Sequence, residues 1–263
     1  MFETVLNGYK LEISLDGYAV TDENWRQNEM HSPYSRLYYV IDGEGVFLYR
    51  GKEIKIEPGY AYFAPTGVPY GFHGTPSVKK LFFHINVIKP DGYDLFSSPD
   101  MRITRIKYGI DEIRRLVELY RSEDPIRLLL LKAQIWGTVM EFATKSLIYE
   151  TRTSQYSKTI LSAITYIREN LSAGLTQKQV ADALFSSVSS LSERFKREMG
   201  TSVATYIEDL VMFEACKMLA ADGKTIGEIS AALGYCDQFY FSRRFTRRFS
   251  VTPREYRRRC AES

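Results

Sequence analysis

The chain has 263 residues, of which 44% are hydrophobic and 25% are charged, and its net charge is +3. This length suffices for two domains with separate cores, and this composition excludes a disordered chain. The charge is uneven, because residues 158–263 carry 16 basic and 12 acidic side chains, whereas residues 1–157 carry 19 and 20. We therefore expect a polyanionic partner to bind the C-terminal part.

Short strands separated by turns are predicted between residues 36 and 87. Their side chains are rich in aromatic and β-branched types, and Gly43-Glu44-Gly45, Pro58-Gly59 and Pro65-Thr66-Gly67 supply turns. The predicted strands span residues 37–41, 46–49, 52–57, 60–64 and 81–87. Short strands at this spacing favour an antiparallel barrel or jelly roll.

Two amphipathic helices are predicted next, over residues 109–121 and from Pro125 to about residue 149. The expected core side of the second helix consists of Leu128, Leu131, Ile135, Val139, Phe142 and Ala143. Further apolar residues widen this stripe, namely Leu129, Leu130, Trp136 and Leu147. We interpret the surplus as a dimer surface. The polar residues 151–157 are predicted to be an interdomain linker.

The C-terminal part contains the same helical pattern twice, with an offset of 49 and then 50 residues. The first copy has Thr176, Val180, Leu184, Leu191, Phe195 and Tyr206; the second has Thr225, Ile229, Leu233, Phe241, Phe245 and Tyr256. A period of this size indicates one supersecondary unit used twice. Two short helices joined by a tight turn can place the second helix in a major groove. We predict helix-turn-helix motifs over residues 176–199 and 225–249.

Helix boundaries are indicated by capping patterns. Capping boxes are predicted at Thr176 with Gln179, Thr225 with Glu228 and Thr252 with Glu255, and a fourth is considered at Ser190 with Glu193. Gly234 is expected to end a helix in the left-handed conformation. Residues 202–221 are predicted to form one stiff helix between the two motifs, which would fix their separation.

The compartment is predicted from what the chain lacks. No segment approaches the ~20 apolar residues of a membrane span, and residues 1–11 lack the apolar core of a signal peptide. Three cysteines (Cys216, Cys236 and Cys260) show no C-x-x-C spacing, which is typical of free thiols rather than of a disulfide framework or zinc site. We expect a cytoplasmic protein without membrane contacts.

Residues 234–259, GYCDQFYFSRRFTRRFSVTPREYRRR, closely resemble the signature of the AraC/XylS family of transcriptional regulators, with Ser250 in place of a usual glycine. The front half resembles the family's cupin-like sensor domain through LYYVIDGEG, PGYAYFAP and FFHINV. The resemblance implies a cytoplasmic bacterial activator or repressor, commonly dimeric, whose sensor domain binds a sugar or other small metabolite.

The expected fold is therefore α+β with two domains. Residues 1–108 would form a cupin-like antiparallel β-barrel (jelly roll), residues 109–150 a helical dimerisation segment, and residues 158–263 an all-α domain with two helix-turn-helix motifs. The expected partners are double-stranded operator DNA, a small-molecule effector such as a carbohydrate, a second copy of the chain and, for an activator, RNA polymerase.

In the second motif, Gln238, Ser242 and Arg243 are predicted to face the bases. Gln can pair with adenine and Arg with guanine, each pair contributing about 1–3 kcal/mol of discrimination. The arginines assigned to phosphates are Arg244, Arg247 and Arg248.

The first motif departs from the family pattern, because Glu193 replaces a base-reading arginine and Ser189 and Ser192 are short. Two interpretations stay open for Glu193: it closes a capping box, which we favour, or it lies at the DNA and weakens or alters base reading. Lys196 and Arg197 are then expected to hold the DNA backbone.

A ligand pocket is predicted in the barrel from aromatic residues with polar groups among them. The candidate ligand-binding residues are Trp25, Arg36, Tyr38, Tyr62, Tyr70 and His73. Aromatic faces with a few convergent polar groups suit a small polar ligand, although strands favour tyrosine in any case, so these residues could instead fill the core.

No metal or other cofactor is expected, because the three histidines (His31, His73 and His84) form no H-x-H motif, and His84 is predicted to be a hydrogen-bonded core residue. The favoured function is a sequence-specific regulator without enzymatic activity. The alternatives are a regulator whose barrel only dimerises and a metal-dependent cupin enzyme fused to a DNA-binding module.

Overall fold

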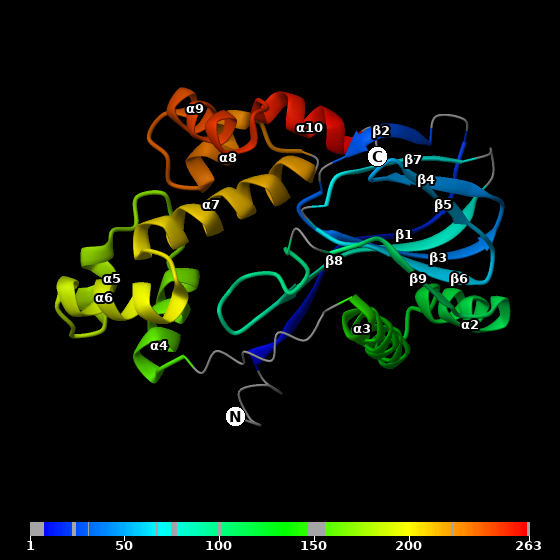
Figure 1. Ribbon diagram of the computed structural model, residues 1–263, viewed down its shortest axis with the longest axis horizontal. Coiled ribbons are helices and arrows are strands. Elements are labelled where there is room, and N and C mark those ends of the chain that lie inside the picture. The colour runs from blue at the N-terminus through cyan, green and yellow to red at the C-terminus, as the bar shows by residue number, and fades with distance from the viewer. Residues whose placement is uncertain are drawn as a thin grey trace. The chain divides into compact units, whose positions relative to one another are not determined.

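The computed structural model describes residues 8–22, 25–30, 32–66, 68–74, 78–98, 101–146, 156–221 and 223–261 (Figure 1). The chain divides into two units. The sheet unit comprises residues 10–88 and 94–150, and the helical unit comprises residues 151–261 together with residues 1–9 and 89–93. In the described part of the chain, no helix is long and apolar enough to cross a membrane.

The sheet unit contains two antiparallel sheets. The first has the order β1 (Lys10–Val20), β8 (Lys79–Ile88), β3 (Ser35–Asp42), β6 (Tyr60–Ala64) and β9 (Thr104–Lys107). The second has the order β2 (Arg26–Met30), β7 (Tyr70–Gly74), β4 (Gly45–Tyr49) and β5 (Lys52–Ile56). This is the jelly-roll arrangement that the sequence predicted, although it did not predict β1, β2, β7 and β9.

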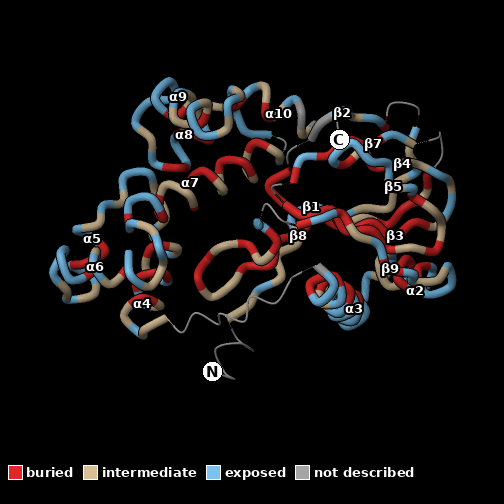
Figure 2. The backbone as a smooth tube through the Cα atoms, viewed as in Figure 1, coloured by how far each residue is buried: buried red, intermediate tan, exposed pale blue. Residues whose placement is uncertain are grey.

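Strand β3 shows how the first sheet divides its side chains between two faces. On one face, Tyr39 packs edge-on against Tyr108, 5.1 Å between ring centroids, just before helix α2 (Ile110–Tyr120). On the other face, Tyr38 stacks on Phe47 of the second sheet at 6.0 Å. Residues 35–40 of β3 are accordingly buried on both faces of the strand (Figure 2).

Helix α3 (Pro125–Ser146) covers the helix side of the first sheet, where Phe142 stacks on Phe63. Five of the six predicted core residues are buried; Leu128 is 40% exposed, so that part of the prediction is wrong. Leu129 and Leu130 are 61% and 52% exposed. Leu147 and residues 151–155 of the predicted linker lie outside the described residues.

The helical unit contains seven described helices, in agreement with the sequence. They are α4 (Lys158–Glu169), α5 (Gln177–Ala183), α6 (Val188–Met199), α7 (Val203–Ala220), α8 (Ile226–Ala232), α9 (Gln238–Phe249) and α10 (Pro253–Ala261). Both predicted boxes at Thr176 and Thr225 are complete, with the side chain of the third helical residue bonded back to the cap. Thr252 also accepts from the Glu255 amide.

The fourth capping box is wrong. Helix α6 begins one residue after Ser187, whose hydroxyl accepts from the Ser190 amide at 3.2 Å. Ser190 therefore lies inside the first turn, and Glu193 lies too far along the helix to close a box on Ser187. The turn before α6 has Phe185 at a φ of 51°, where the second motif has Gly234 at 79°.

Helix α7 lies between the helix pairs of the two motifs (Figure 1) and packs against α6, α8 and α10. Its buried residues belong to one core shared by all seven helices. The fully buried residues Phe195 and Phe245, one from each motif, belong to the same cluster. A single core fixes the two motifs to one framework.

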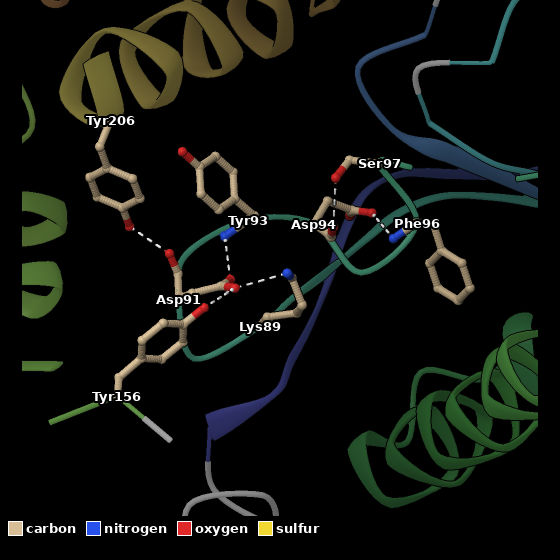
Figure 3. A network of polar contacts seen from close by, with 8 residues as sticks. All are labelled: Lys89, Asp91, Tyr93, Asp94, Phe96, Ser97, Tyr156 and Tyr206. Carbon is tan, nitrogen blue, oxygen red and sulfur yellow. Dashed lines mark hydrogen bonds and ion pairs between the residues drawn. The ribbon is translucent and has the colours of Figure 1, made fainter. Parts of the chain in front are cut away.

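Residues 89–93, the hairpin tip, continue strand β8 and group with the helical unit. Figure 3 shows the contacts of Asp91, whose backbone carbonyl accepts from the Tyr206 hydroxyl of α7 at 2.7 Å. The Asp91 carboxylate accepts from Lys89 at 2.8 Å and from the Tyr156 hydroxyl at 3.2 Å. Tyr93 packs edge-on against Tyr206. The sequence did not predict this attachment.

Candidate DNA-binding surface and ligand-binding site

Helix α9 presents a polar surface opposite its buried side. Phe241 and Phe245 are completely buried, and Asp237 caps the helix by accepting from the amides of residues 239 and 240. Gln238 and Arg243 are exposed, as the sequence predicted for residues that face the bases. Ser242 is half-buried and its hydroxyl donates to the Gln238 carbonyl at 2.8 Å, which leaves its lone pairs for a ligand.

The four arginines of α9 fall into two pairs. Arg244 forms an ion pair with Glu208 of α7, and Arg248 lies 3.1 Å from the Asp209 carboxylate. Arg243 and Arg247 are exposed and pair with no carboxylate among the described residues. Arg244 and Arg248, which the sequence predicts to contact phosphates, also hold α9 against α7 through these ion pairs.

Two exposed aromatic residues on α9 were not predicted from the sequence as DNA-binding residues. Phe239 is 66% exposed and Tyr240 is 45% exposed, beside Gln238 at the start of the helix. The guanidinium carbon of Arg243 lies 5.9 Å from the Tyr240 ring centroid. The exposure of the two aromatic residues could have been inferred from the sequence, because neither falls on the helical side set by the core residues Phe241 and Phe245. Exposed rings at this end can contact thymine methyl groups.

Helix α6 carries less free positive charge than α9. The Glu193 side chain is 80% exposed and lies 3.8 Å from Arg197, which also lies 3.8 Å from Glu198. The favoured capping role of Glu193 is thus wrong, and its carboxylate stands on the outer face of the helix. Lys196 and Ser189 are exposed. The Ser192 hydroxyl donates to the Val188 carbonyl at 2.7 Å.

Two basic side chains lie inside the sheet unit, between its sheets. Arg36 of β3 is 1% exposed and donates to the Tyr38 hydroxyl at 3.4 Å, while its Nε has no partner among the described atoms. Lys80 of β8 is 5% exposed, and its Nζ lies 3.9 Å from the Trp25 ring centroid and 4.1 Å from that of Tyr38. The sequence pattern predicted Arg36 as a ligand-binding residue but did not indicate Lys80.

The environment of Lys80 is costly for a charged amine. A desolvated cation–π contact contributes about 2 kcal/mol, whereas burying an ion costs several kcal/mol. Burial, and then the nearby Arg36 guanidinium, lower the pKa of Lys80 well below its usual value. In the described part of the chain, no carboxylate forms an ion pair with Arg36 or Lys80 to offset this cost.

His84 lies beside these two cations, opposite Arg36 in the ladder between β3 and β8. Its ring stacks on Tyr34 at 4.3 Å, and its buried Nδ1 has no hydrogen-bond partner among the described residues. His84 is a core residue, as predicted, but its Nδ1 makes no hydrogen bond within the described part of the chain. Burial, then Arg36 and Lys80, lower the pKa of His84 to about 2, so the imidazole is neutral near pH 7.

The other predicted pocket residues separate into two groups. Trp25, Tyr38 and Tyr70 lie with Arg36 between the sheets, and the Trp25 Nε1 and Tyr70 hydroxyl have no described partner. Tyr62 is also buried, but its hydroxyl already accepts a 2.8 Å hydrogen bond from the Glu57 amide.

His73 does not belong with them. It is exposed, because it follows Phe72 on β7 and neighbouring residues of a strand point to opposite faces. Among the described residues, no three His, Cys, Asp or Glu side chains lie close enough to hold a metal; His31 is outside that set.

Both halves of the chain match known protein families. A model described as a helix-turn-helix domain matches residues 180–259, and a model described as a cupin domain matches residues 20–84. The first covers α9 and most of the first motif. The second covers strands β2 to β7 and the part of β8 that carries Lys80 and His84.

Similar proteins share these regions to different extents. The lactose operon transcription activator of Staphylococcus xylosus is 23% identical over 234 residues, 85% of this chain and 83% of that protein. The xylose operon regulatory protein of Escherichia coli (strain K12) is 32% identical over 114 residues, 42% of this chain but only 29% of that protein. Among solved structures, the C-terminal domain of AraT, a response regulator from Geobacillus stearothermophilus, is 32% identical over 40% of this chain and 87% of that chain, with a TM-score of 0.38.

Proposed function

Because this chain belongs to the AraC/XylS family of transcriptional regulators, we propose that it controls its target genes by reading operator DNA with α9 and sensing a small molecule between the sheets of its cupin domain. The observation that carries the DNA-binding part is the exposed surface of α9, where Gln238 and Arg243 flank Ser242. Both side-chain types can form bidentate contacts with base edges in the major groove.

The two motifs contribute unequally in this proposal. Arg243 and Arg247 of α9 pair with no carboxylate of the described residues, whereas on α6 Arg197 is partly neutralised by Glu193 and Glu198. We assign base reading to α9, with Phe239 and Tyr240 adding apolar contacts, and backbone binding to Lys196 and Arg197. Ser189 and Ser192 play a minor part.

The effector is assigned to the buried cluster of Arg36, Tyr38, Tyr70 and Trp25, with Lys80 and His84 in place of His73. Unpartnered buried polar atoms support a ligand there, because such atoms are costly unless something satisfies them. The names of the similar regulators refer to lactose and xylose operons. These names support an effector from carbohydrate metabolism.

Signal transfer is assigned to strand β8. Lys80 and His84 lie on this strand, and the hairpin tip that follows it bonds to Tyr206 of α7. A ligand that shifts β8 would move the tip, and through α7 both recognition helices. Linkage then requires operator DNA to change the effector affinity by the same factor as the effector changes the DNA affinity.

Dimerisation is assigned to the start of α3. Ile126, Leu129 and Leu130 are 64%, 61% and 52% exposed, which is a large apolar surface for one helix end. A second copy of the chain would cover it. We also propose that the protein has no catalytic activity and that, as an activator, it would contact RNA polymerase. The proposed domain boundaries are those predicted from the sequence, after residues 108, 150 and 157.

The test starts from a pool of random duplexes. Repeated selection with the full-length protein should enrich one sequence, and fluorescence anisotropy then compares that duplex with a scrambled one. We expect the parent protein to prefer the selected duplex at least 10³-fold. Arg114→Ala, on α2 of the sheet unit, is the control and should bind as the parent does. A pool without enrichment overturns the proposal.

A further inference from the structure

The arrangement of charge between the two sheets restricts the chemistry of the effector. Arg36 and Lys80 approach the same residue from two sides: the guanidinium at the Tyr38 hydroxyl and the ammonium nitrogen above the Tyr38 ring. Both are more than nine-tenths buried. His84 completes this group, which we call the cationic cluster, and its Nδ1 is buried without a described partner.

Among the described residues, no carboxylate forms an ion pair with Arg36 or Lys80 of the cationic cluster. The side chains around the cationic cluster are aromatic: Trp25 and Tyr38 at Lys80, and Tyr34 at Arg36 and His84. Aromatic faces stabilise a cation only partly, and a guanidinium with five donors is satisfied by oxygen atoms rather than by rings. A neutral sugar would supply hydroxyl groups but would leave the charge unbalanced.

We propose that the cationic cluster binds an anionic oxygen group, a carboxylate or a phosphate, of the small-molecule effector. This inference rests on the proposed sensing function and narrows its ligand from a sugar-like molecule to an acid or phosphate ester. Arg36 pairs with the oxygen atoms and Lys80 supplies a second cation. The remaining aromatic surface, including Tyr70 with its unpartnered hydroxyl, receives the uncharged part of the ligand.

Proton uptake follows from the same arrangement. Burial and Arg36 lower the Lys80 pKa, and an anion beside the amine would raise it again, since an opposite charge favours the ammonium form. The groups that face Lys80 and influence this step are Arg36 of β3 and His84 of β8. Binding should therefore take up a proton where the free protein has a neutral amine.

Trp25 reports on this site because the Lys80 nitrogen lies 3.9 Å from its ring. The chain contains only two tryptophans, so Trp136→Phe leaves Trp25 as the single indole. We would titrate this variant with inorganic phosphate and, separately, with acetate, while sodium chloride keeps the ionic strength constant. The two arms distinguish phosphate from carboxylate recognition.

The expected result is a saturable change in Trp25 emission in at least one arm. Lys80→Met in the same background should weaken the apparent affinity at least about tenfold, the effect of losing one charged partner. Lys79→Met is the matched control, because Lys79 is the next residue of β8 but is exposed and paired with Asp42; it should leave the titration unchanged. Lys80→Gln serves as a second variant, and circular dichroism verifies the fold of each.

Two outcomes overturn the proposal: emission that never saturates in either arm, and a response that Lys80→Met and Lys80→Gln leave intact. Calorimetry in two buffers of different ionisation enthalpy should also detect proton uptake on binding, and its absence contradicts the role of Lys80. Operator binding is measured on the same protein without added anion. A chain that binds no specific duplex refutes the regulator but leaves the anion result standing.

Discussion

The Tyr206 hydroxyl of α7 donates a 2.7 Å hydrogen bond to the backbone carbonyl of Asp91 in the hairpin tip. The residue after Asp91 is Gly92, with a φ of 83°, and a Cβ at this position would collide with the same hydroxyl. Glycine is therefore required at position 92 for two reasons: the backbone is left-handed there, and a side chain would clash with the Tyr206 hydroxyl. The tip is shaped to fit one side chain of the helix between the motifs.

Tyr206→Phe should loosen this attachment without disturbing the core packing of the ring. A buried carbonyl that loses its donor costs about 1–3 kcal/mol, so the unfolding free energy of the helical unit should fall by that order. Amide hydrogen exchange in residues 89–93 should accelerate more than in α7. Tyr166→Phe on α4 is the control, and equal exchange in the two variants would contradict the role of the hydroxyl.

Arg243→Ala and Arg247→Ala should weaken DNA binding in different ways. Arg243→Ala is expected to lose about 1–3 kcal/mol at one base pair of the selected duplex and to relax the preference there. Arg247→Ala should weaken all duplexes alike and reduce the slope of log affinity against log salt by about 1. Anisotropy titrations at four salt concentrations separate the two patterns. If both variants lower affinity uniformly, Arg243 does not read a base.

The helical half was predictable from sequence because its signals are local. Capping boxes at Thr176 and Thr225 and the period of buried residues depend on neighbours three or four positions apart. The start of α6 was misplaced because several serines precede it, and Ser187 and Ser190 satisfy the same local rule. Only the packing of Leu191 and Phe195 decides between them.

The cationic cluster was not predictable in the same way. A lysine in a strand is normally solvated, and only the register that pairs Val40 with Lys80 and Arg36 with His84 shows that both basic residues face the second sheet. Such pairing is a long-range property. His73 illustrates the reverse error, because its proximity in sequence to Phe72 hid the fact that they point to opposite faces.

Glu193→Gln should strengthen the binding of any duplex. The exposed Glu193 carboxylate lies 3.8 Å from Arg197 on the outer face of α6. Removing its charge frees Arg197 for a phosphate and removes a repulsive group, so the salt slope should steepen by up to about 1. Glu169→Gln at the end of α4 is a control with the same change in net charge. A weaker selected-duplex affinity in Glu193→Gln would instead indicate that the carboxylate reads a base.

Ser250→Gly should stabilise the protein. Ser250 ends α9 at a φ of 59°, and Gly200 ends α6 at 72° in the corresponding place of the first motif. A side chain in the left-handed region costs roughly 1–2 kcal/mol. The substitution Gly200→Ser should lower the unfolding free energy by a similar amount. A Cβ added at this position meets no other atom, so only the backbone conformation opposes the side chain. Urea unfolding of both variants measures the two changes in unfolding free energy. Changes of the same sign would contradict the backbone explanation.

Lys80→Met should make stability less dependent on pH. Burial and the Arg36 guanidinium lower the pKa of folded Lys80, whereas the unfolded amine keeps its ordinary value of 10.5. Between these two values the unfolded chain binds more protons, so lowering the pH destabilises the fold by at most about 1.4 kcal/mol per pH unit from this group.

Lys80→Met abolishes this contribution, since methionine is buried without a charge. The variant should therefore exceed the parent in stability near pH 7, and the difference should shrink as the pH rises toward 10.5. Arg36, His84, Tyr38 and Tyr70 lie around the same site in both proteins. Because Lys80 itself contributes to the lowered pKa of His84, the comparison is confined to pH values above 6.5, the ordinary pKa of His84, where the imidazole is neutral. Unfolding by urea at a series of pH values gives the difference. A gap that stays constant with pH would mean that Lys80 is charged in the folded protein, and that an acidic partner already holds it.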